Sequence, residues 1–478
     1  MLFNSLDFII FLPLVFFIYW FWCSNNIKKQ NFLLLIASYV FYGWWDWRFL
    51  SLIIFSSFVD FKIGIFLSKT KTINGRKLLL AASVIINLGF LAFFKYYNFF
   101  LENFVNAFTF FGETISIERL NIILPVGISF YTFQTLSYTI DVYRKQLEPT
   151  KDPIAFFTFV SFFPQLVAGP IERATNLLPQ FYKQRKFEYH RAVDGLRQIL
   201  WGLFKKIVIA DNAAKYANII FNDSENYSGS TLLLGALLFA FQIYGDFSGY
   251  SDVAIGTSRL FGFNLKKNFS FPYFSRDIGE FWRRWHISLS TWFRDYLYIP
   301  IGGSRGSIWK KIRNVFIIFL VSGFWHGANW TFIVWGALNA LYFLPLMIYG
   351  KNRVNTNNVA ENRLFPTFKE FMQIAVTFFI TLIAWVFFRA DNISHAYSYV
   401  LEIFSPSLFN PVEVFPLNVL LYIMLFMTVE WLQRNKEHAL ELNNKQVPKT
   451  IRFLIYYVLI ASIFLFGGDQ QEFIYFQF

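Results

Sequence analysis

Runs of apolar residues, separated by short polar segments, fill most of the chain. They lie at residues 8–22, 31–45, 49–67, 78–94, 122–140, 154–168, 199–220, 231–256, 315–350, 368–388, 414–433 and 450–467. A helix needs about 20 apolar residues to cross a hydrocarbon layer about 30 Å thick. The pattern therefore predicts an all-α fold, a polytopic bundle of about ten to twelve membrane-embedded helices, in which residues 1–478 form a single transmembrane domain.

Composition supports a membrane protein. The chain has 478 residues, of which 55% are hydrophobic and only 15% are charged, whereas about 25% of the residues in a soluble domain are charged. Cys23 is the only cysteine, so neither an intramolecular disulfide nor a thiolate metal cluster can form, and no metal site is predicted. Asp7 precedes the first apolar run and Lys28 and Lys29 follow it, so this run is expected to be a retained first span, not a cleaved signal peptide.

The net charge of +13 is concentrated in two basic regions. Residues 172–206 hold eight Lys/Arg against three Asp/Glu, and residues 266–313 hold ten against three. An excess of Lys and Arg marks cytoplasmic loops, so both regions are expected in the cytoplasm and the N-terminus outside. Because the basic residues lie between spans and form no soluble domain, nucleic acid is excluded as a partner, and membrane lipids are expected around the bundle.

Two segments depart from a simple span. In residues 159–174, Pro164, Gly169 and Pro170 lie inside or against an apolar run, which is compatible with either a re-entrant segment or a Pro-kinked helix. Residues 281–300 predict one amphipathic helix, with aromatic residues on one face and Arg283, His286 and Arg294 on another. It could be an interfacial helix with solvated arginines, or Arg283 and Arg284 could attract an anionic donor.

Acidic residues occur inside the apolar run around residues 241–259. Asp246 and Asp252 are surrounded there by Gly245, Gly249 and Gly256. Intramembrane acids usually face a cavity or a cationic partner. A structural ion pair, for example with Arg259, and a direct substrate contact are both compatible with this pattern.

His326 is the candidate of greatest chemical interest. It lies in a stretch of thirty-six residues, 315–350, that contains no Asp, Glu, Lys or Arg. Two full spans need about forty residues, so the sequence "GAN" after His326 predicts a break between two helices near membrane depth. Gly323 and Gly327 form a G-x-x-x-G pattern, which is typical of close helix packing. A desolvated imidazole stays neutral and could act as a general base, or it could be a structural hydrogen-bonding group between helices.

Other chemistry finds no support. The sequence contains no nucleophile elbow, H-E-x-x-H motif, P-loop or dinucleotide fingerprint. His190, His395 and His438 occur in charged or interfacial segments and are expected to be solvated. The segment 351–363, "KNRVNTNNVAENR", is expected to be a flexible polar loop.

Several motifs together resemble the membrane-bound O-acyltransferase (MBOAT) family, and within it the bacterial membrane subunits of alginate O-acetyltransferase type. These motifs are "FWRRWHISLSTWFRDYLYIPIGG", "FWHGANWTFIVWGALNA", "LPVGISFYTFQTLSYTIDVYR", "FFPQLVAGPIERA", "YGDFSGYSDVAIG", "WVFFRADNISHA" and the closing "EFIYFQF". The likeness covers essentially the whole chain. It implies the MBOAT fold, with re-entrant or interfacial helices and a central channel in which a cytoplasmic acyl donor meets an acceptor from the other side.

The resemblance also implies roles for single residues. His326, in the W-H-G motif, would be the catalytic base, and His286 a second functional histidine on the cytoplasmic side. Weaker candidates for donor binding or channel lining are Arg283, Arg284, Trp325, Asn329, Asp246, Ser248 and Gln165.

The implied reaction is O-acyl transfer in the bacterial cytoplasmic membrane. The donor would be acetyl-CoA or another acyl thioester, used as a substrate, with no bound cofactor. The acceptor would be a polysaccharide hydroxyl or an extracytoplasmic SGNH-type partner. Transfer of D-alanyl from a carrier protein to a teichoic-acid-like polymer is an alternative, and a polysaccharide or lipid transporter is the competing class, although no inverted repeat of the kind found in transporters is visible.

Overall fold

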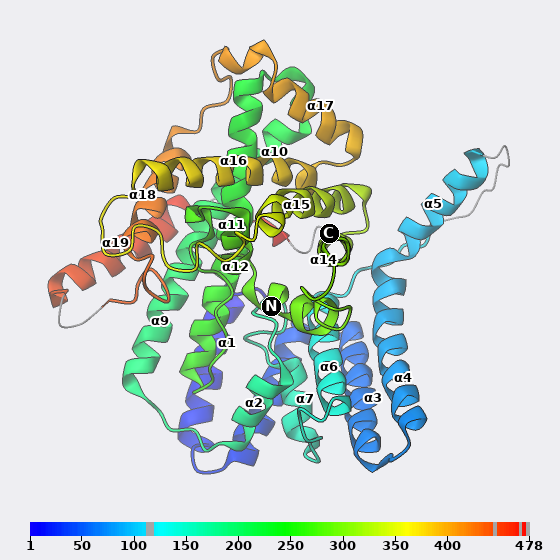
Figure 1. Ribbon diagram of the computed structural model, residues 1–478. Helices are drawn as coiled ribbons and strands as arrows, with labels where there is room; N and C mark the ends of the chain where they lie inside the picture. Colours follow the sequence, from blue (N-terminus) through cyan, green and yellow to red (C-terminus); the bar gives the residue numbers. More distant parts are fainter. Residues whose placement is uncertain (111–118, 443–446, 468–470, 475–478) are drawn as a thin grey trace. The chain divides into compact units, whose positions relative to one another are not determined.

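The computed structural model describes residues 1–110, 119–442, 447–467 and 471–474, and within these residues it contains helices and no strands (Figure 1). The all-α fold expected from the sequence is confirmed. The chain divides into two compact units. Unit 1 consists of Met1–Ala192 and Thr257–Leu265, and unit 2 of Val193–Gly256 and Lys266–Phe478. That residues 1–478 form a single transmembrane domain stays a prediction.

Unit 1 is built from the N-terminal helices. They are α1 (Leu6–Phe17), α2 (Ile27–Asp46), α3 (Leu50–Lys69), α4 (Ile73–Leu91), α5 (Tyr97–Phe110), α6 (Ile128–Tyr143), α7 (Pro153–Ser161) and α8 (Ala174–Leu177). Helices α3, α4 and α6 pack together around the buried carboxylate of Asp60. The Asp60 oxygens accept hydrogen bonds from Ser83 Oγ at 2.5 Å and from Asn87 Nδ2 at 2.8 Å. Hydrogen-bond donors on a neighbouring helix thus replace water for this acid.

Residues 162–173 of unit 1 form turns and not a continuous helix. Helix α7 ends at Ser161, three residues before Pro164, and the turns that follow are buried. The sequence was compatible with a re-entrant segment or a Pro-kinked helix, and the interpretation as a Pro-kinked helix is therefore wrong. Irregular backbone of this kind is stable when surrounding protein satisfies its polar groups, and here Ser38 Oγ accepts a hydrogen bond from the Phe163 N–H at 3.0 Å.

A later piece of the chain completes the core of unit 1. Residues Thr257–Leu265 pack against α1 and its continuation, where Tyr19 Oη donates to the Phe261 carbonyl at 3.1 Å and Trp20 Nε1 donates to the Leu260 carbonyl at 3.0 Å. The Phe261 ring also contacts the Phe163 ring, with centroids 5.8 Å apart. Unit 1 is thus formed by two separate stretches of sequence.

Unit 2 contains the remaining helices. They are α9 (Tyr189–Phe204, from residue 193 on), α10 (Asp211–Asn222), α11 (Gly229–Leu260, up to residue 256), α12 (Ile278–Arg284), α13 (Ile287–Phe293), α14 (Ile308–His326), α15 (Trp330–Ile348), α16 (Phe368–Arg389), α17 (Ile393–Ile403), α18 (Leu417–Leu432) and α19 (Lys449–Phe466). A π-helical turn, η5 (Lys205–Ala210), continues α9, and a second, η8 (Arg294–Tyr298), continues α13.

Helices α14 and α15 form a tight hairpin because glycine lines their contact. A Cβ atom on Gly323 would lie 2.2 Å from the Phe332 carbonyl oxygen, and one on Gly336 would lie 2.4 Å from the Phe319 carbonyl oxygen. Only glycine permits this approach of two backbones. The close packing predicted from the G-x-x-x-G pattern is confirmed for Gly323.

By length and composition, six helical segments of the described chain could cross a membrane, and two shorter apolar helices, Leu6–Trp22 and Leu417–Leu432, accompany them. The chain is a multi-pass membrane protein. Two of the six segments contain two α-helices each, α2 and α3 in Ile27–Lys69 and α4 and α5 in Ile73–Phe110, and the ten to twelve helices expected were membrane-embedded helices and not only spans. The runs at 122–140 and 154–168 give α6 and α7, which have 16 and 9 residues, and a helix of about 20 residues is needed to span.

The segment 351–363 is a loop, as predicted, and arginines bind its carbonyl groups. Arg283 donates to the carbonyls of Asn352 at 2.8 Å and Asn355 at 2.7 Å. Arg434 donates to the carbonyls of Val359 and Ala360, both at 2.9 Å. These contacts join the loop to α12 and to the end of α18, and the flexibility expected of the loop stays a prediction.

Candidate active site

The break between α14 and α15 determines the position of His326. His326 is the last residue of α14, Gly327 and Ala328 form the break, and Asn329 begins α15 by accepting a hydrogen bond from the Thr331 N–H at 3.0 Å. A Cβ atom on Gly327 would meet the Phe332 ring at 2.0 Å, so a larger residue here would require that ring to move. The broken helix predicted from "GAN" is confirmed.

Aromatic rings surround the His326 imidazole. His326 is only 4% exposed. Its ring centroid lies 4.9 Å from that of Trp325, 5.2 Å from Trp335 and 5.3 Å from Phe388. A neutral imidazole carries a lone pair on one ring nitrogen, and this lone pair can accept a proton from a bound group.

His286 lies at a second helix break. Helix α12 ends at Arg284 and α13 begins at Ile287, and His286 between them has φ 44° and ψ 53°. The single amphipathic helix expected over 281–300 is therefore wrong. His286 is only 1% exposed, and it does not share a solvated face with the exposed Arg283. Left-handed backbone at a non-glycine residue costs about 1–3 kcal/mol and is often found at functional sites.

The environment of His286 keeps its imidazole neutral. Burial lowers the pKa of His286 to about 3, because a charged ring loses the solvation that water would provide. Its Nδ1 lies 3.1 Å from the amide oxygen Oδ1 of Asn268, and its ring contacts Phe247 with centroids 4.6 Å apart.

Trp325 connects the two histidines. Its ring centroid is 6.2 Å from that of His286 and 4.9 Å from that of His326. Although forty residues separate the two histidines in the sequence, α12, α13 and α14 bring both to the same indole within unit 2. The structure thus gathers His286, Trp325 and His326, the three aromatic candidates from the sequence, into one buried cluster.

Comparison with known proteins identifies the family of the chain. Residues 149–389, which include all three cluster residues, match the sequence profile of MBOAT, the membrane-bound O-acyltransferase family. The chain belongs to the MBOAT family. It is an acyltransferase of this family, and the resemblance drawn from its motifs is confirmed.

Individual bacterial proteins are similar to this chain over most of its length. A protein of Pseudomonas aeruginosa named "Probable alginate O-acetylase AlgI" is 40% identical over 85% of this chain and 75% of its own length. The protein of the same name from Pseudomonas putida is 36% identical over the full length of both chains. The "Peptidoglycan O-acetyltransferase" of Helicobacter pylori is 33% identical over 100% of this chain and 98% of its own length.

Arg283 and Arg284, which were predicted to attract the acyl donor, bind carbonyl groups and a carboxylate of the protein itself. Arg283 donates to two loop carbonyls, as described above. Arg284 is paired with Glu280 at 2.9 Å and donates to the Ser270 carbonyl at 3.2 Å. Both residues thus have structural partners, and their role in donor binding stays a prediction.

Asp246 and Ser248 belong to a network of buried charges on α11. Lys206 Nζ lies 2.9 Å from Asp246 Oδ1, and Lys205 Nζ lies 2.6 Å from Asp252 Oδ2 and 2.9 Å from Ser248 Oγ. The cationic partner of Asp246 is therefore a lysine, where the sequence suggested Arg259. The two lysines come from η5 and are among the eight cations of the first basic region, so part of that region is buried.

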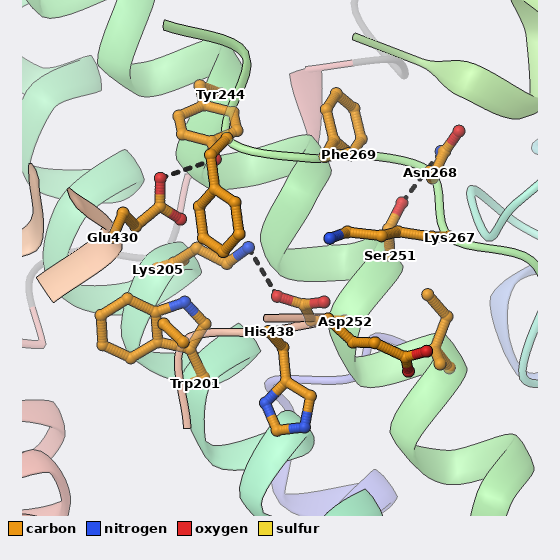
Figure 2. Close-up of a pocket in the computed structure, with 14 residues that line it drawn as sticks. Trp201, Lys205, Tyr244, Ser251, Asp252, Lys267, Asn268, Phe269, Glu430 and His438 are labelled. Carbon is orange, nitrogen blue, oxygen red and sulfur yellow. Dashed lines mark hydrogen bonds and ion pairs between the residues drawn. The ribbon is translucent and has the colours of Figure 1, made fainter. Parts of the chain in front are cut away.

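A small polar cavity lies beside this network (Figure 2). Its volume of about 20 Å³ is enough for a single water molecule. Figure 2 shows Lys205 facing Asp252, Tyr244 facing Glu430 at 2.7 Å, and Asn268 facing Ser251 at 3.1 Å. Asn268 therefore lines the cavity on one side and contacts His286 on the other.

Two weaker candidates have clear structural contacts. Gln165 belongs to unit 1, whereas both histidines belong to unit 2, and its Nε2 donates to Gln134 Oε1 at 3.0 Å. Asn329 caps α15 and donates from Nδ2 to the Asp391 carbonyl at 2.8 Å. A role in lining a channel stays a prediction for both.

The remaining histidines differ from one another. His190 is exposed, as predicted. The expectation of a solvated His438 is wrong, because its side chain is 0% exposed and its Nε2 lies 3.1 Å from Asp194 Oδ1. His395 is half-buried, with Nε2 3.1 Å from Ser224 Oγ.

Sequence reasoning missed Asn268, Trp335 and Phe388. Trp335 and Phe388 contact His326 from α15 and α16, where a helical aromatic residue is indistinguishable from ordinary core. Asn268 follows two lysines in an irregular segment. The motif pattern gave no signal for it, since its contacts to Ser251 and His286 are made only in the folded chain.

Proposed function

We propose that this MBOAT protein acetylates a cell-envelope polysaccharide of a bacterium, with acetyl-CoA as the cytoplasmic donor and the cytoplasmic membrane as its location. The names of the similar proteins support the choice of acetyl groups and polysaccharide acceptors. The observation that carries the proposal is the position of His326 at a helix break, buried among rings and linked to His286 through Trp325.

In the proposed reaction, the neutral His326 imidazole removes the proton of the acceptor hydroxyl. The hydroxyl oxygen then attacks the thioester carbonyl carbon, a C–O bond forms, and the C–S bond breaks. The proton passes from the imidazolium to the departing thiolate, so that His326 is neutral again. A positioned base of this kind typically contributes about 10²–10⁴-fold to the rate.

The acceptor is either the polysaccharide hydroxyl itself or a serine hydroxyl on an extracytoplasmic SGNH-type partner, which would pass the acetyl group on. His326 performs the same proton transfer in both cases. The mature polysaccharide is the final product in either route, so the appearance of acetyl label in the polymer measures the whole reaction.

Transfer of D-alanyl from a carrier protein is the second candidate. It is supported by the "Teichoic acid D-alanyltransferase" of Bacillus subtilis, which is 28% identical over 58% of this chain. That likeness is lower and shorter than the likeness to the O-acetylating proteins, which favours acetyl. Incubation of membranes with either labelled acetyl-CoA or labelled D-alanyl carrier protein distinguishes the two donors.

The test of the proposed base is His326→Gln. Glutamine can donate and accept hydrogen bonds but cannot take up a proton at neutral pH. We expect acetyl transfer from radiolabelled acetyl-CoA to fall by about 10²–10⁴-fold, while the amount of protein in the membrane, measured by immunoblot, stays near that of the wild type. His190→Gln, at an exposed position, is the matched control and should transfer acetyl normally. Near-normal transfer by His326→Gln would show that His326 is structural.

A further inference from the structure

The side-chain amide of Asn268 has a fixed orientation. The N–H of Ser288 points at Oδ1 of Asn268 at 3.2 Å, and Ser288 Oγ donates to the same oxygen at 2.8 Å. A backbone N–H can only donate, so the amide atom facing Ser288 must be the oxygen and not the nitrogen. The amide nitrogen, on the other side, donates to Ser251 Oγ at 3.1 Å.

This orientation determines which nitrogen of His286 carries the proton. Nδ1 of His286 lies 3.1 Å from Asn268 Oδ1, and an amide oxygen has no proton to give. The hydrogen bond therefore requires a proton on Nδ1. A neutral imidazole has one ring proton, so Nε2 of His286 carries the lone pair.

The backbone around Asn268 supports the same arrangement. The Ile287 N–H donates to the Asn268 carbonyl at 2.8 Å, and the Ser270 N–H donates to the Arg284 carbonyl at 2.9 Å. Residues 268–270 thus bind the chain on both sides of the left-handed His286. The ring and its acceptor are held by the same short segment, which limits rotation of one relative to the other.

We propose that Asn268 is a positioning residue that holds His286 in the tautomer with the proton on Nδ1 and a basic lone pair on Nε2. This inference rests on the proposed function, in which His286 acts in acyl transfer. With the proton fixed on Nδ1, the lone pair that can accept a proton or hydrogen bond from a reacting group is on Nε2. Without Asn268, the neutral ring would divide between two tautomers and two orientations.

The first test is a double-mutant cycle with Asn268→Ala and His286→Gln. Loss of a partner that orients a functional histidine at a metal site typically costs about 10–100-fold in activity, and we expect a loss of this size in acetyl transfer for Asn268→Ala. In the His286→Gln background, Asn268→Ala should cost little more, because the ring it orients is absent. Losses that multiply in the double variant would overturn the inference, since they would show that Asn268 acts independently of His286.

Ser251→Ala is the matched control for this cycle. It removes the hydrogen bond from the amide nitrogen of Asn268 and leaves both donors from Ser288 in place, so the amide oxygen still faces His286. We expect acetyl transfer by Ser251→Ala to remain within about threefold of the wild type, a change of less than 1 kcal/mol. A loss as large as that of Asn268→Ala would overturn the inference, because it would assign the effect to the cavity and not to the histidine.

The second test uses the pH profile of Asn268→Asp. A carboxylate keeps the acceptor for Nδ1 but attracts a positive charge, so it raises the pKa of His286. The variant should retain transfer at alkaline pH and lose it at lower pH, where Nε2 becomes protonated, and this loss should begin at a higher pH than any loss seen in the wild type. The other titratable groups near Asn268 are the same in both proteins; they are Lys205, Asp252, Lys267, Glu430, Glu437 and His438 in the cavity and His326 beyond Trp325. Superimposable profiles for the variant and the wild type would overturn the inference.

Failure of this inference differs from failure of the proposed function. Full activity of Asn268→Ala together with reduced activity of His286→Gln and His326→Gln would reject the role of Asn268 alone. Full activity of His326→Gln would reject the proposed base, whatever the result at Asn268.

Discussion

At the scale of single residues, buried lysines on a π-helical turn hold the acidic groups of α11. Lys205 and Lys206 are adjacent in sequence, and both face inward, to Asp252 and Asp246 respectively. In a regular α-helix, adjacent side chains point about 100° apart. In the wider turn of η5, Lys205 and Lys206 both face inward. One short segment thus neutralises the charges of two buried carboxylates.

Removal of one member of the Lys205–Asp252 pair should destabilise unit 2. We expect Lys205→Met to leave Asp252 buried without its ammonium partner, which typically costs about 3–5 kcal/mol. Thermal unfolding of the detergent-solubilised protein should therefore begin at a lower temperature. The double variant Lys205→Met/Asp252→Asn should recover part of the loss, because the uncompensated charge is gone, and an unchanged or lower midpoint in the double variant would contradict this explanation.

Arg283 should affect donor binding more than chemistry. Phosphate contacts far from the reacting carbonyl are made equally in the ground and transition states, so their loss raises KM and leaves kcat unchanged. We expect Arg283→Ala to raise the apparent KM for acetyl-CoA. Its side chain also binds the loop carbonyls of Asn352 and Asn355, so Arg434→Ala, which loosens the same loop from another side, is the control. A collapse of kcat with unchanged KM would contradict the assignment.

Sequence reasoning identified some site residues correctly and others incorrectly, for physical reasons. His326 was recognisable because a titratable residue in a long uncharged stretch is unusual and the following "GAN" favours a break. The burial of His438 was not recognisable, because its partner Asp194 is 244 residues away in the sequence. Local composition cannot report a contact that only the folded chain makes.

At the scale of helices, the same distinction applies. The hairpin of α14 and α15 was expected from spacing and glycine positions, and it is observed. The single helix over 281–300 was not observed, because aromatic periodicity continues through residue 286 although the backbone reverses into the left-handed region there. Periodicity reports which residues are apolar and does not report a single residue with an unusual φ.

The glycine contact between α14 and α15 predicts a specific loss of stability. Gly323→Ala would place a Cβ atom 2.2 Å from the Phe332 carbonyl oxygen, which requires the two helices to separate. We expect a destabilisation of about 1–3 kcal/mol, the usual range for an overpacked contact, seen as a lower midpoint of thermal unfolding in detergent.

Gly89→Ala provides the matched control for this substitution. Gly89 lies inside α4, and no atom outside its own helical turn lies within 4 Å of a Cβ placed there. Because alanine is also the better helix former, the midpoint of this variant should be equal to or above that of the wild type. Equal effects of Gly323→Ala and Gly89→Ala would show that the α14–α15 contact is looser than described.

At the scale of the whole molecule, the distribution of Lys and Arg predicts the orientation in the membrane. Gln184 is exposed and lies among Lys183, Arg185 and Lys186 in the first basic region. In a Cys23→Ala background, Gln184→Cys should react with a membrane-impermeant thiol reagent only after the cells are opened, because this region is expected in the cytoplasm. Modification in intact cells would reverse the assigned topology.

A buried position close by controls for accessibility. Phe181 is fully buried, so Phe181→Cys should remain unmodified both before and after the cells are opened. Reaction at this position would indicate that the region had unfolded, and the result for Gln184→Cys would then have to be repeated under milder conditions.

The division of unit 1 into two stretches of sequence has a consequence for biosynthesis. A ribosome synthesises the chain from its N-terminus, and the residues Thr257–Leu265 that pack against Tyr19 and Trp20 emerge long after α1 has been made. Until then, the Tyr19 hydroxyl and the Trp20 indole N–H have no Phe261 or Leu260 carbonyl to bind. Part of the contact surface of the N-terminal helices therefore stays uncovered until the ribosome has translated more than half of the coding sequence.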